Sequence, residues 1–141
     1  HKKGWDILGR AESIAYLALA NESLAFMELA IEKRFERKII SNGYYLAHNS
    51  AMALLSLFGI ESSSHKYTIS FINKNYCKEN LIPQHLGAGF HFLEEMRKKA
   101  DYDPLYTFTD LSVAKCVTIA KELSVELGKL IDKELQGSDK D

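Results

Sequence analysis

One uncharged segment constrains the fold more than any other part of the sequence. No Asp, Glu, Lys or Arg lies between Lys38 and Glu61, and the run NGYYLAHNSAMALLSLFG fills positions 42–59. At helical spacing its apolar residues form two adjacent seams, which is the pattern of a central helix buried on most sides. It lacks the ~18 uninterrupted apolar residues of a membrane span. The seams are formed by Tyr44, Ala47, Ala51, Leu54 and Phe58, and by Tyr45, His48, Met52 and Leu55, with Asn49 and Ser56 on the one polar edge.

Composition limits the classes of function that this chain can serve. Hydrophobic residues make up 46% of the 141 positions and charged residues 26%, which is typical of one soluble globular domain. The formal net charge of −1 gives no global attraction to nucleic acid, so any such binding requires a local patch. Cys77 and Cys116 form no CxxC pattern, and we expect two buried thiols in a reducing cytosol. With no signal peptide or lipidation motif visible, the expected location is cytoplasmic, without a membrane partner.

Apolar periodicity predicts an all-α fold: an up-and-down antiparallel bundle of four long helices plus one short helix. All of residues 1–141 are expected to form a single domain, with a disordered polar tail at 137–141. The first helix is predicted as one long element, although a kink near Asn21 would divide it in two. The short segment after the central helix alternates like a strand in part, but no second strand exists for it to pair with. The predicted helices are 5–35, 37–58, 65–77, 84–100 and 109–135.

Two glycines in the fourth predicted helix suggest that another backbone comes close. Gly87 and Gly89 each cost about 1 kcal/mol of helix propensity, which close packing would explain. The central helix also looks too apolar for one bundle to cover. Together these features predict a homodimer.

Charged residues near the helix ends and outer faces are expected to be solvated. The pairs Glu94–Lys98 and Glu95–Lys99 have the acid first at i, i+4, as on an exposed helix face. The basic cluster at 33–38 is interpreted as a solvated junction between the first two helices.

Arg97 is the most informative candidate for a functional residue. Its helical position places it on the apolar face with Phe90 and Leu93, where a guanidinium must be paired or must face a ligand. Asp101 lies one turn further on, and Tyr102 can offer a hydroxyl. Two interpretations stay open: a buried Arg–Asp clamp, or a cationic pocket for phosphate formed with neighbouring tyrosines.

Other candidate ligand contacts come from the central helix and from the short helix after it. His48 is either a satisfied core histidine or a partner of Arg97, and His65 can donate a hydrogen bond to phosphate from the start of the short helix. Tyr44 and Tyr45 belong to the core or to a base-stacking surface.

No metal or cofactor site is expected. His85 and His91 are six residues apart, about 120° around a helix, so they cannot share a metal ion. His91 and Glu95 could share one, but two ligands do not make a site. There is no Walker loop, dinucleotide fingerprint or nucleophile elbow.

Four segments in order carry a resemblance to a known family: GYYLAHNSAMALL, SSSHK, EEMRKKADYD and TFTD. The chain resembles the small archaeal and bacterial HEPN (higher eukaryotes and prokaryotes nucleotide-binding) domains over about residues 24–131, with 1–23 as an N-terminal helical extension. The resemblance implies a helical bundle, often a homodimer, commonly encoded beside a minimal nucleotidyltransferase as the toxin half of a toxin–antitoxin pair.

Many members of that family are metal-independent RNases whose signature is an arginine followed by a histidine. The arginine maps to Arg97, but no histidine follows His91, and Tyr102 stands near the expected position. A tyrosine with a pKa near 10 is a poor general base at neutral pH. The main expectation is therefore a nucleotide- or RNA-binding or regulatory module. An RNase using Arg97 and Tyr102, His48 or His65 is the first alternative, and a purely structural interaction bundle is the second.

Overall fold

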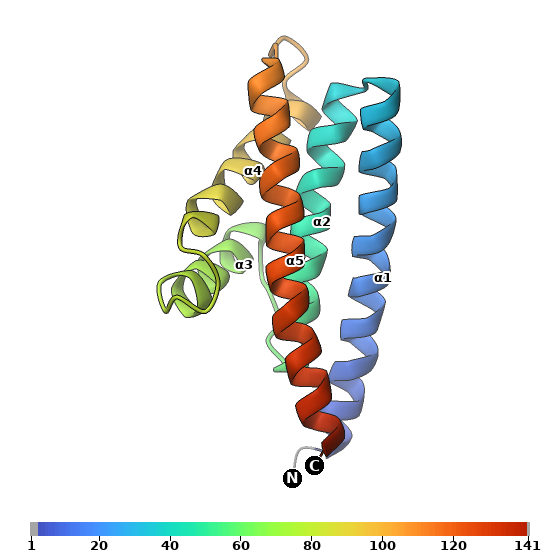
Figure 1. The fold of residues 1–141 in the computed structure, drawn as a ribbon, viewed down its shortest axis with the longest axis vertical. Coiled ribbons are helices and arrows are strands. Elements are labelled where there is room, and N and C mark those ends of the chain that lie inside the picture. Colours follow the sequence, from blue (N-terminus) through green and yellow to red (C-terminus); the bar gives the residue numbers. More distant parts are fainter. Residues whose placement is uncertain (1–2, 141) are drawn as a thin grey trace.

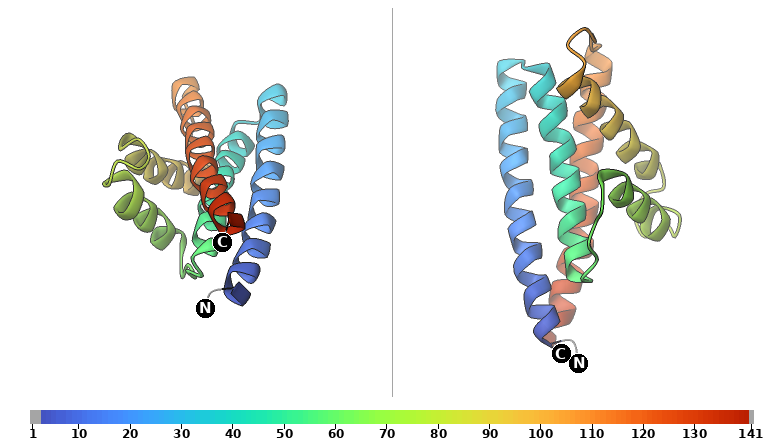
Figure 2. Two further views of the ribbon diagram at one scale, coloured as in Figure 1. Left: turned by 60° about the horizontal axis from the view of Figure 1, so that its bottom comes forward. Right: turned by 180° about the vertical axis from the view of Figure 1, so that it is seen from behind.

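The computed structural model describes residues 3–140, and all regular structure in that range is helical. Helices α1, α2 and α5 run side by side along the long axis, while α4 is inclined against them and α3 lies beside α4 (Figure 1). The views in Figure 2 place α3 and α4 on the side of the bundle away from α1. The predicted all-α helical bundle is confirmed. The elements are α1 (Lys3–Lys33), α2 (Glu36–Leu57), α3 (His65–Ile72), the π-helix η1 (Asn73–Cys77), α4 (His85–Tyr102) and α5 (Asp110–Lys140).

Helix α2 is the central element that its uncharged sequence predicts. Its apolar residues are buried against α1, α5 and α4. The expected polar edge is only half right, because Ser56 is buried while Asn49 is half-buried. Ser56 is covered by the start of α1, where a Cβ added to Gly9 would lie 2.8 Å from the Ser56 carbonyl oxygen.

Most helix boundaries follow local capping chemistry. Helix α1 is one continuous helix past Asn21, and Gly59 follows α2 with a φ of 66°, a backbone conformation that glycine adopts at no steric cost. The Ser64 side chain accepts a hydrogen bond from the Tyr67 amide and begins α3. Two helices end later than predicted, since α4 includes residues 101 and 102 and α5 continues to Lys140.

The two glycines of α4 are explained within one chain, which corrects the sequence argument for a dimer. A Cβ on Gly87 would lie 2.9 Å from the Asn73 side-chain Cγ, and one on Gly89 would lie 3.0 Å from a methyl carbon of Ile119. These positions therefore allow η1 and α5 to approach α4. They carry no information about a second copy.

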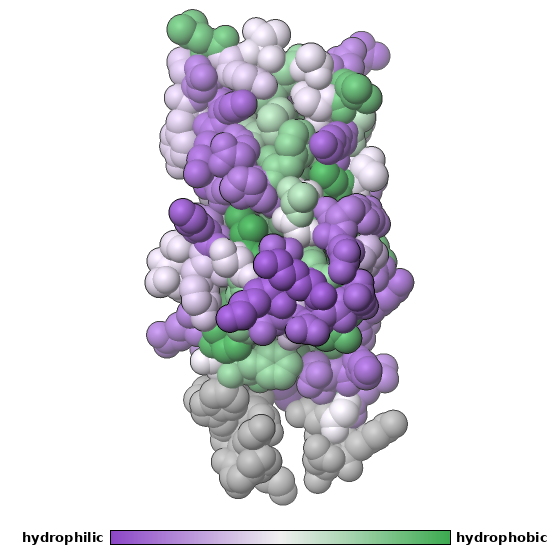
Figure 3. Space-filling model, turned by 90° about the vertical axis from the view of Figure 1, so that its left-hand side faces the viewer, coloured by the Kyte–Doolittle hydropathy of each residue, from purple (hydrophilic) through white to green (hydrophobic). Residues whose placement is uncertain are grey.

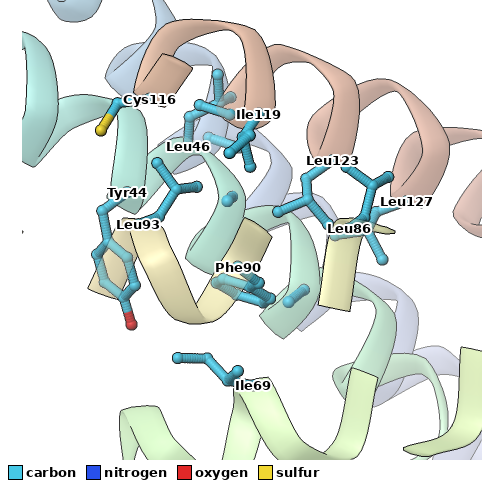
Figure 4. Close-up of a cluster of buried hydrophobic side chains, with 14 of the residues drawn as sticks. Tyr44, Leu46, Ile69, Leu86, Phe90, Leu93, Cys116, Ile119, Leu123 and Leu127 are labelled. Carbon is cyan, nitrogen blue, oxygen red and sulfur yellow. The ribbon is translucent and has the colours of Figure 1, made fainter. Parts of the chain in front are cut away.

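The core between α2, α4 and α5 places one polar group at its edge. Figure 4 shows Tyr44 beside Leu93 and Phe90, with its ring among apolar side chains and its hydroxyl pointing away from them. The free thiols of Cys77 and Cys116 are buried, as predicted, and burial raises the pKa of Cys116 to about 11.

Arg37 connects the start of α2 to the end of α4. The solvated junction predicted for residues 33–38 is wrong at this residue, whose terminal nitrogens donate to backbone carbonyl oxygens at 2.8–3.3 Å. Its guanidinium carbon also lies 5.3 Å from the centre of the Phe108 ring. Arg37 therefore caps the C-terminal end of α4 and fixes the loop that follows. The accepting carbonyls belong to Lys99, Ala100, Asp103, Pro104 and Tyr106.

Helix α1 carries apolar residues on two faces. One face packs on α2, whereas the opposite face leaves Leu19, Phe26 and Leu29 about half exposed. Its segment Gly9–Lys33 is long and apolar enough to cross a membrane by length and composition, and 17% of its most apolar window is buried. Core helices and signal sequences pass the same test, so this property alone assigns no location.

Candidate functional site

Three helices bring five polar or aromatic side chains together at the edge of the core. Tyr44 and His48 lie one turn apart on α2, His65 is the first residue of α3, and Glu94 and Arg97 lie one turn apart on α4. Ser64 caps the N-terminus of α3 and so sets the position of His65, the first residue of that helix. The packing of α4 on α2 places Arg97 against the ring of Tyr44. Residues far apart in the sequence thus form one cluster.

Arg97 points inward, as its register predicts, and is only 5% exposed. It forms a close ion pair with Glu94 and a longer one with Asp101 at 3.7 Å, and it donates to the Tyr102 hydroxyl at 3.5 Å. Burial by itself would lower the pKa of Arg97, but the adjacent Glu94 carboxylate outweighs that effect and raises it. The guanidinium is therefore a permanent positive charge inside the protein.

Glu94 is the site residue that the sequence interpretation missed. It was expected on the outer surface paired with Lys98, yet it is only 4% exposed and contacts Arg97 instead. Lys98 lies 3.9 Å from Glu95, its i−3 neighbour. The i, i+3 spacing of Glu94 and Arg97 was the available signal, because two residues so spaced share a helix face.

Two histidines and a tyrosine form a hydrogen-bonded group next to this ion pair. The Tyr44 hydroxyl lies 2.5 Å from Nδ1 of His65 and 3.4 Å from Nδ1 of His48, and the two imidazole rings are 4.6 Å apart. Burial, reinforced by the nearby His65 and Arg97, lowers the pKa of His48 to about 4, so His48 is neutral at pH 7. Burial and the Glu94 carboxylate raise the pKa of Tyr44, which keeps its hydroxyl protonated. His65 Nδ1 also lies 3.8 Å from Glu94.

Three tyrosine rings surround the Arg97 guanidinium. Its central carbon lies 5.1 Å from the ring centre of Tyr44, 6.0 Å from that of Tyr45 and 5.7 Å from that of Tyr102, distances at which a cation is attracted to an aromatic face. Burial raises the pKa of Tyr45, whereas the side chain of Tyr102 is largely exposed. All seven predicted ligand contacts therefore lie in one cluster around Arg97.

A cavity of about 550 Å³ opens between α3 and α4 beside this cluster. Its size falls in the ~300–1,000 Å³ range of small-molecule sites. The face that carries α3 and α4 is dominated by hydrophilic side chains with apolar patches between them (Figure 3). Three permanent cations, Lys66, Arg97 and Lys98, line the cavity with His65 and His91. The other lining residues are Ser64, Ile69, Ser70, Glu94 and Glu95.

The described residues offer no metal centre. His85 is paired with Glu122 at 3.0 Å and His91 with Glu95 at 4.0 Å, and no three acidic, histidine or cysteine residues between positions 9 and 137 are grouped for a metal ion. The chemistry of this site thus rests on a buried arginine, two lysines and imidazoles.

The arginine of this all-helical bundle is held beside His48 and His65, and His65 lines the cavity. The sequence profile of the HEPN domain matches residues 15–130, so the chain belongs to the HEPN family. A UPF0332 protein from Thermotoga maritima is 25% identical over 113 residues, which cover 80% of this chain and 86% of that relative. The resemblance stated from the sequence is confirmed, and the match begins earlier than the predicted residue 24.

Proposed function

We propose that this protein binds a nucleotide or RNA through a phosphate group held in the cavity between α3 and α4. The observation that carries the proposal is the set of three permanent cations, Arg97, Lys66 and Lys98, on one cavity of ligand size. Against the two carboxylates of the lining, Glu94 and Glu95, these three cations leave the cavity with a net charge of +1 in a chain of net charge −1, a local attraction that the composition does not reveal. Lysine and arginine are the side chains that recognise phosphate most often in proteins.

The neighbours of the cavity support a nucleotide over a simple anion. His65 lines the cavity and its side chain is 41% exposed, so a planar aromatic surface is close to the cations. Nucleic-acid sites commonly combine cations for the backbone with aromatic rings for the bases. A purely structural bundle would need neither the cavity nor its lysines.

Charge reversal at the cavity tests this proposal. The probe is a 2′-O-methyl ApA dinucleotide, which carries one phosphodiester, and its binding is measured by calorimetry in low salt. Lys66→Glu and Lys98→Glu should each weaken binding at least about tenfold, because a like charge replaces a phosphate contact. Lys133→Glu, on the exposed surface of α5, changes the net charge equally and should leave the affinity nearly unchanged. Equal effects of all three substitutions would contradict a local site.

RNA cleavage without a metal ion is the second candidate function, and His65 is the observation in its favour. This imidazole lines the cavity, and the Tyr44 hydroxyl on Nδ1 fixes the orientation of its ring. With Nδ1–H donated to the Tyr44 oxygen, a neutral imidazole so placed can accept the proton of a ribose 2′-hydroxyl at Nε2 as that oxygen attacks phosphorus. The bond from phosphorus to the 5′ oxygen breaks, the 5′ oxygen takes a proton from water, and a 2′,3′-cyclic phosphate remains.

An incubation with structured and unstructured RNA in EDTA decides between binding and cleavage. Cleavage would require His65, so His65→Asn should remove it while His85→Asn, at an exposed histidine outside the cavity, should not. RNA that stays intact at high protein excess would leave binding as the sole function.

We also propose a protein partner, the minimal nucleotidyltransferase that the family resemblance implies, in a toxin–antitoxin pair. Co-expression of the chain with the product of a neighbouring reading frame tests this proposal directly. A stable complex on gel filtration is the expected result, and separate elution would contradict it.

For self-association we propose that a second copy covers the outer face of α1. This face carries Glu12 and Glu22 in its first two-thirds and Lys33 at its C-terminal end, all exposed. Antiparallel pairing of two α1 helices that brings Glu12 of one copy to Lys33 of the other would also bring Leu19 to Phe26 and bury both. A membrane surface fits less well, because helices that lie on membranes carry mainly Lys and Arg beside their apolar face.

Light scattering tests the dimer. The wild type should be a dimer at micromolar concentration, and Phe26→Asp should give a monomer with unchanged helicity. Val125→Asp, at an apolar residue of α5 that is exposed to a similar degree, should remain a dimer. A monomeric wild type, or one that binds vesicles through Phe26, would overturn the proposal.

A further inference from the structure

Arg97 already has an anionic partner in Glu94. Its carboxylate forms the closest ion pair of the cluster with the Arg97 guanidinium, and both side chains are only 6% exposed. Glu94 also lines the cavity itself. Together with Asp101 at 3.7 Å, the two carboxylates give the Arg97 cluster one negative charge in excess. An incoming phosphate must therefore replace an anion that is already bound.

The pairing between these two residues is incomplete. Oε2 of Glu94 and Nε of Arg97 are both buried without a hydrogen-bond partner. A buried polar atom that lacks a partner costs about 1–3 kcal/mol. The ion pair in this structure thus leaves one donor and one acceptor that a different arrangement can satisfy.

An alternative partner for Glu94 is already in place. His65 on α3 lies 3.8 Å from the second carboxylate oxygen. From α2 the protonated Tyr44 hydroxyl, the neutral His48 and the ring of Tyr45 lie beside it, and His91 of α4 lines the same cavity. His65 is the most exposed of these groups, with its side chain 41% exposed, so it can take up a proton from solvent. An imidazolium at that position would pair with Glu94 once a phosphate has replaced Glu94 on Arg97.

We propose that Glu94 is an internal competitor for Arg97: a bound phosphate displaces the carboxylate, which turns to His65 as that imidazole takes up one proton from solvent. This inference rests on the proposed phosphate site and adds its regulation. It makes Glu94 a residue that sets affinity without touching the ligand. Binding should consequently tighten as the pH falls.

Substitution of Glu94 by glutamine provides the test. Glu94→Gln keeps the shape and a hydrogen-bond acceptor for Arg97 but removes the competing charge, so 2′-O-methyl ApA should bind at least about tenfold more tightly. The control is Glu32→Gln, at an exposed residue of α1 that does not line the cavity, and its solvent-screened charge should change the affinity by no more than about twofold. A folded Glu94→Gln protein with unchanged or weaker binding would overturn the proposal.

The pH dependence of the wild type gives a second readout that needs no substitution at Glu94. The phosphodiester keeps one charge between pH 8 and pH 5.5, so a rise in affinity over that range reports proton uptake by the protein. Calorimetry in buffers of different ionisation enthalpy should record about one proton taken up per ligand by the wild type and by Glu32→Gln. Binding with no proton uptake would refute the exchange while leaving the phosphate site intact. Absence of binding in every variant at every pH would instead refute the phosphate site.

Discussion

Arg37→Ala should destabilise the protein far more than its place in a basic, partly exposed cluster suggests. Three of the carbonyls that it binds, those of Lys99, Ala100 and Tyr106, are partly buried, and water cannot fully replace the guanidinium there. Hydrogen bonds to a charged group contribute roughly 1.5–3 kcal/mol each, and the carbonyls regain some water, so we expect a net loss of about 3 kcal/mol. The unfolding entropy of 141 residues is about 0.3 kcal/mol per degree, so Tm should fall by roughly 10 °C.

Thermal and urea unfolding monitored by circular dichroism measure this loss. Lys38→Ala, at the next and exposed position of α2, is the matched control and should stay within about 0.5 kcal/mol of the wild type. Arg37→Lys should fall between the two, because one ammonium cannot reach carbonyls in so many directions. If Arg37→Ala is as stable as Lys38→Ala, the hydrogen bonds from Arg37 to the end of α4 contribute nothing to the free energy of unfolding.

Other predictions concern the cluster and the helix contacts. Arg97→Ala should lower the free energy of unfolding by about 3–5 kcal/mol because it leaves the buried Glu94 carboxylate without its cationic partner. The double variant with Glu94→Gln should regain part of that loss in a double-mutant cycle of urea unfolding. The pKa of His48 lies below its unfolded value, so the unfolded state binds more protons between pH 6.5 and 4, and stability should fall as the pH drops through that range. His48→Gln should flatten this pH profile, and a His48 resonance that titrates near pH 6.5 in NMR would contradict it. Gly87→Ala should destabilise by about 1–3 kcal/mol through overpacking against η1, whereas Gly128→Ala, which meets open space in α5, should stabilise by up to about 1 kcal/mol in the same denaturation assay.

The fold was accessible from the sequence because helical periodicity is a local signal. The seams of α2 and the inward register of Arg97 follow from residues three or four positions apart, and the structure has both. The glycine after α2 and the serine before α3 likewise act on neighbouring backbone, and both boundaries lie within one residue of the predicted ones. Such features require no knowledge of which helices meet.

The errors concern contacts between distant segments. Glu94 has the i+4 lysine typical of an exposed helix face, and only the arrival of α3 with His65 shows that it is buried. Arg37 lies in a basic run, and its role depends on carbonyls more than 60 residues away. Gly87 and Gly89 indicated a close approach correctly but could not show that the neighbours were η1 and α5. In each case the local sequence pattern was compatible with two different structural environments.

The position of α1, on the side of the bundle away from α3 and α4, determines what a dimer built on its outer face could do. Two copies joined through α1 would present their cavities on opposite outer sides, each lined by residues of one chain only (Figure 2). Such a particle would be bivalent. A short nucleotide would occupy each cavity independently, whereas a long RNA that reached around the particle would gain avidity from the second contact.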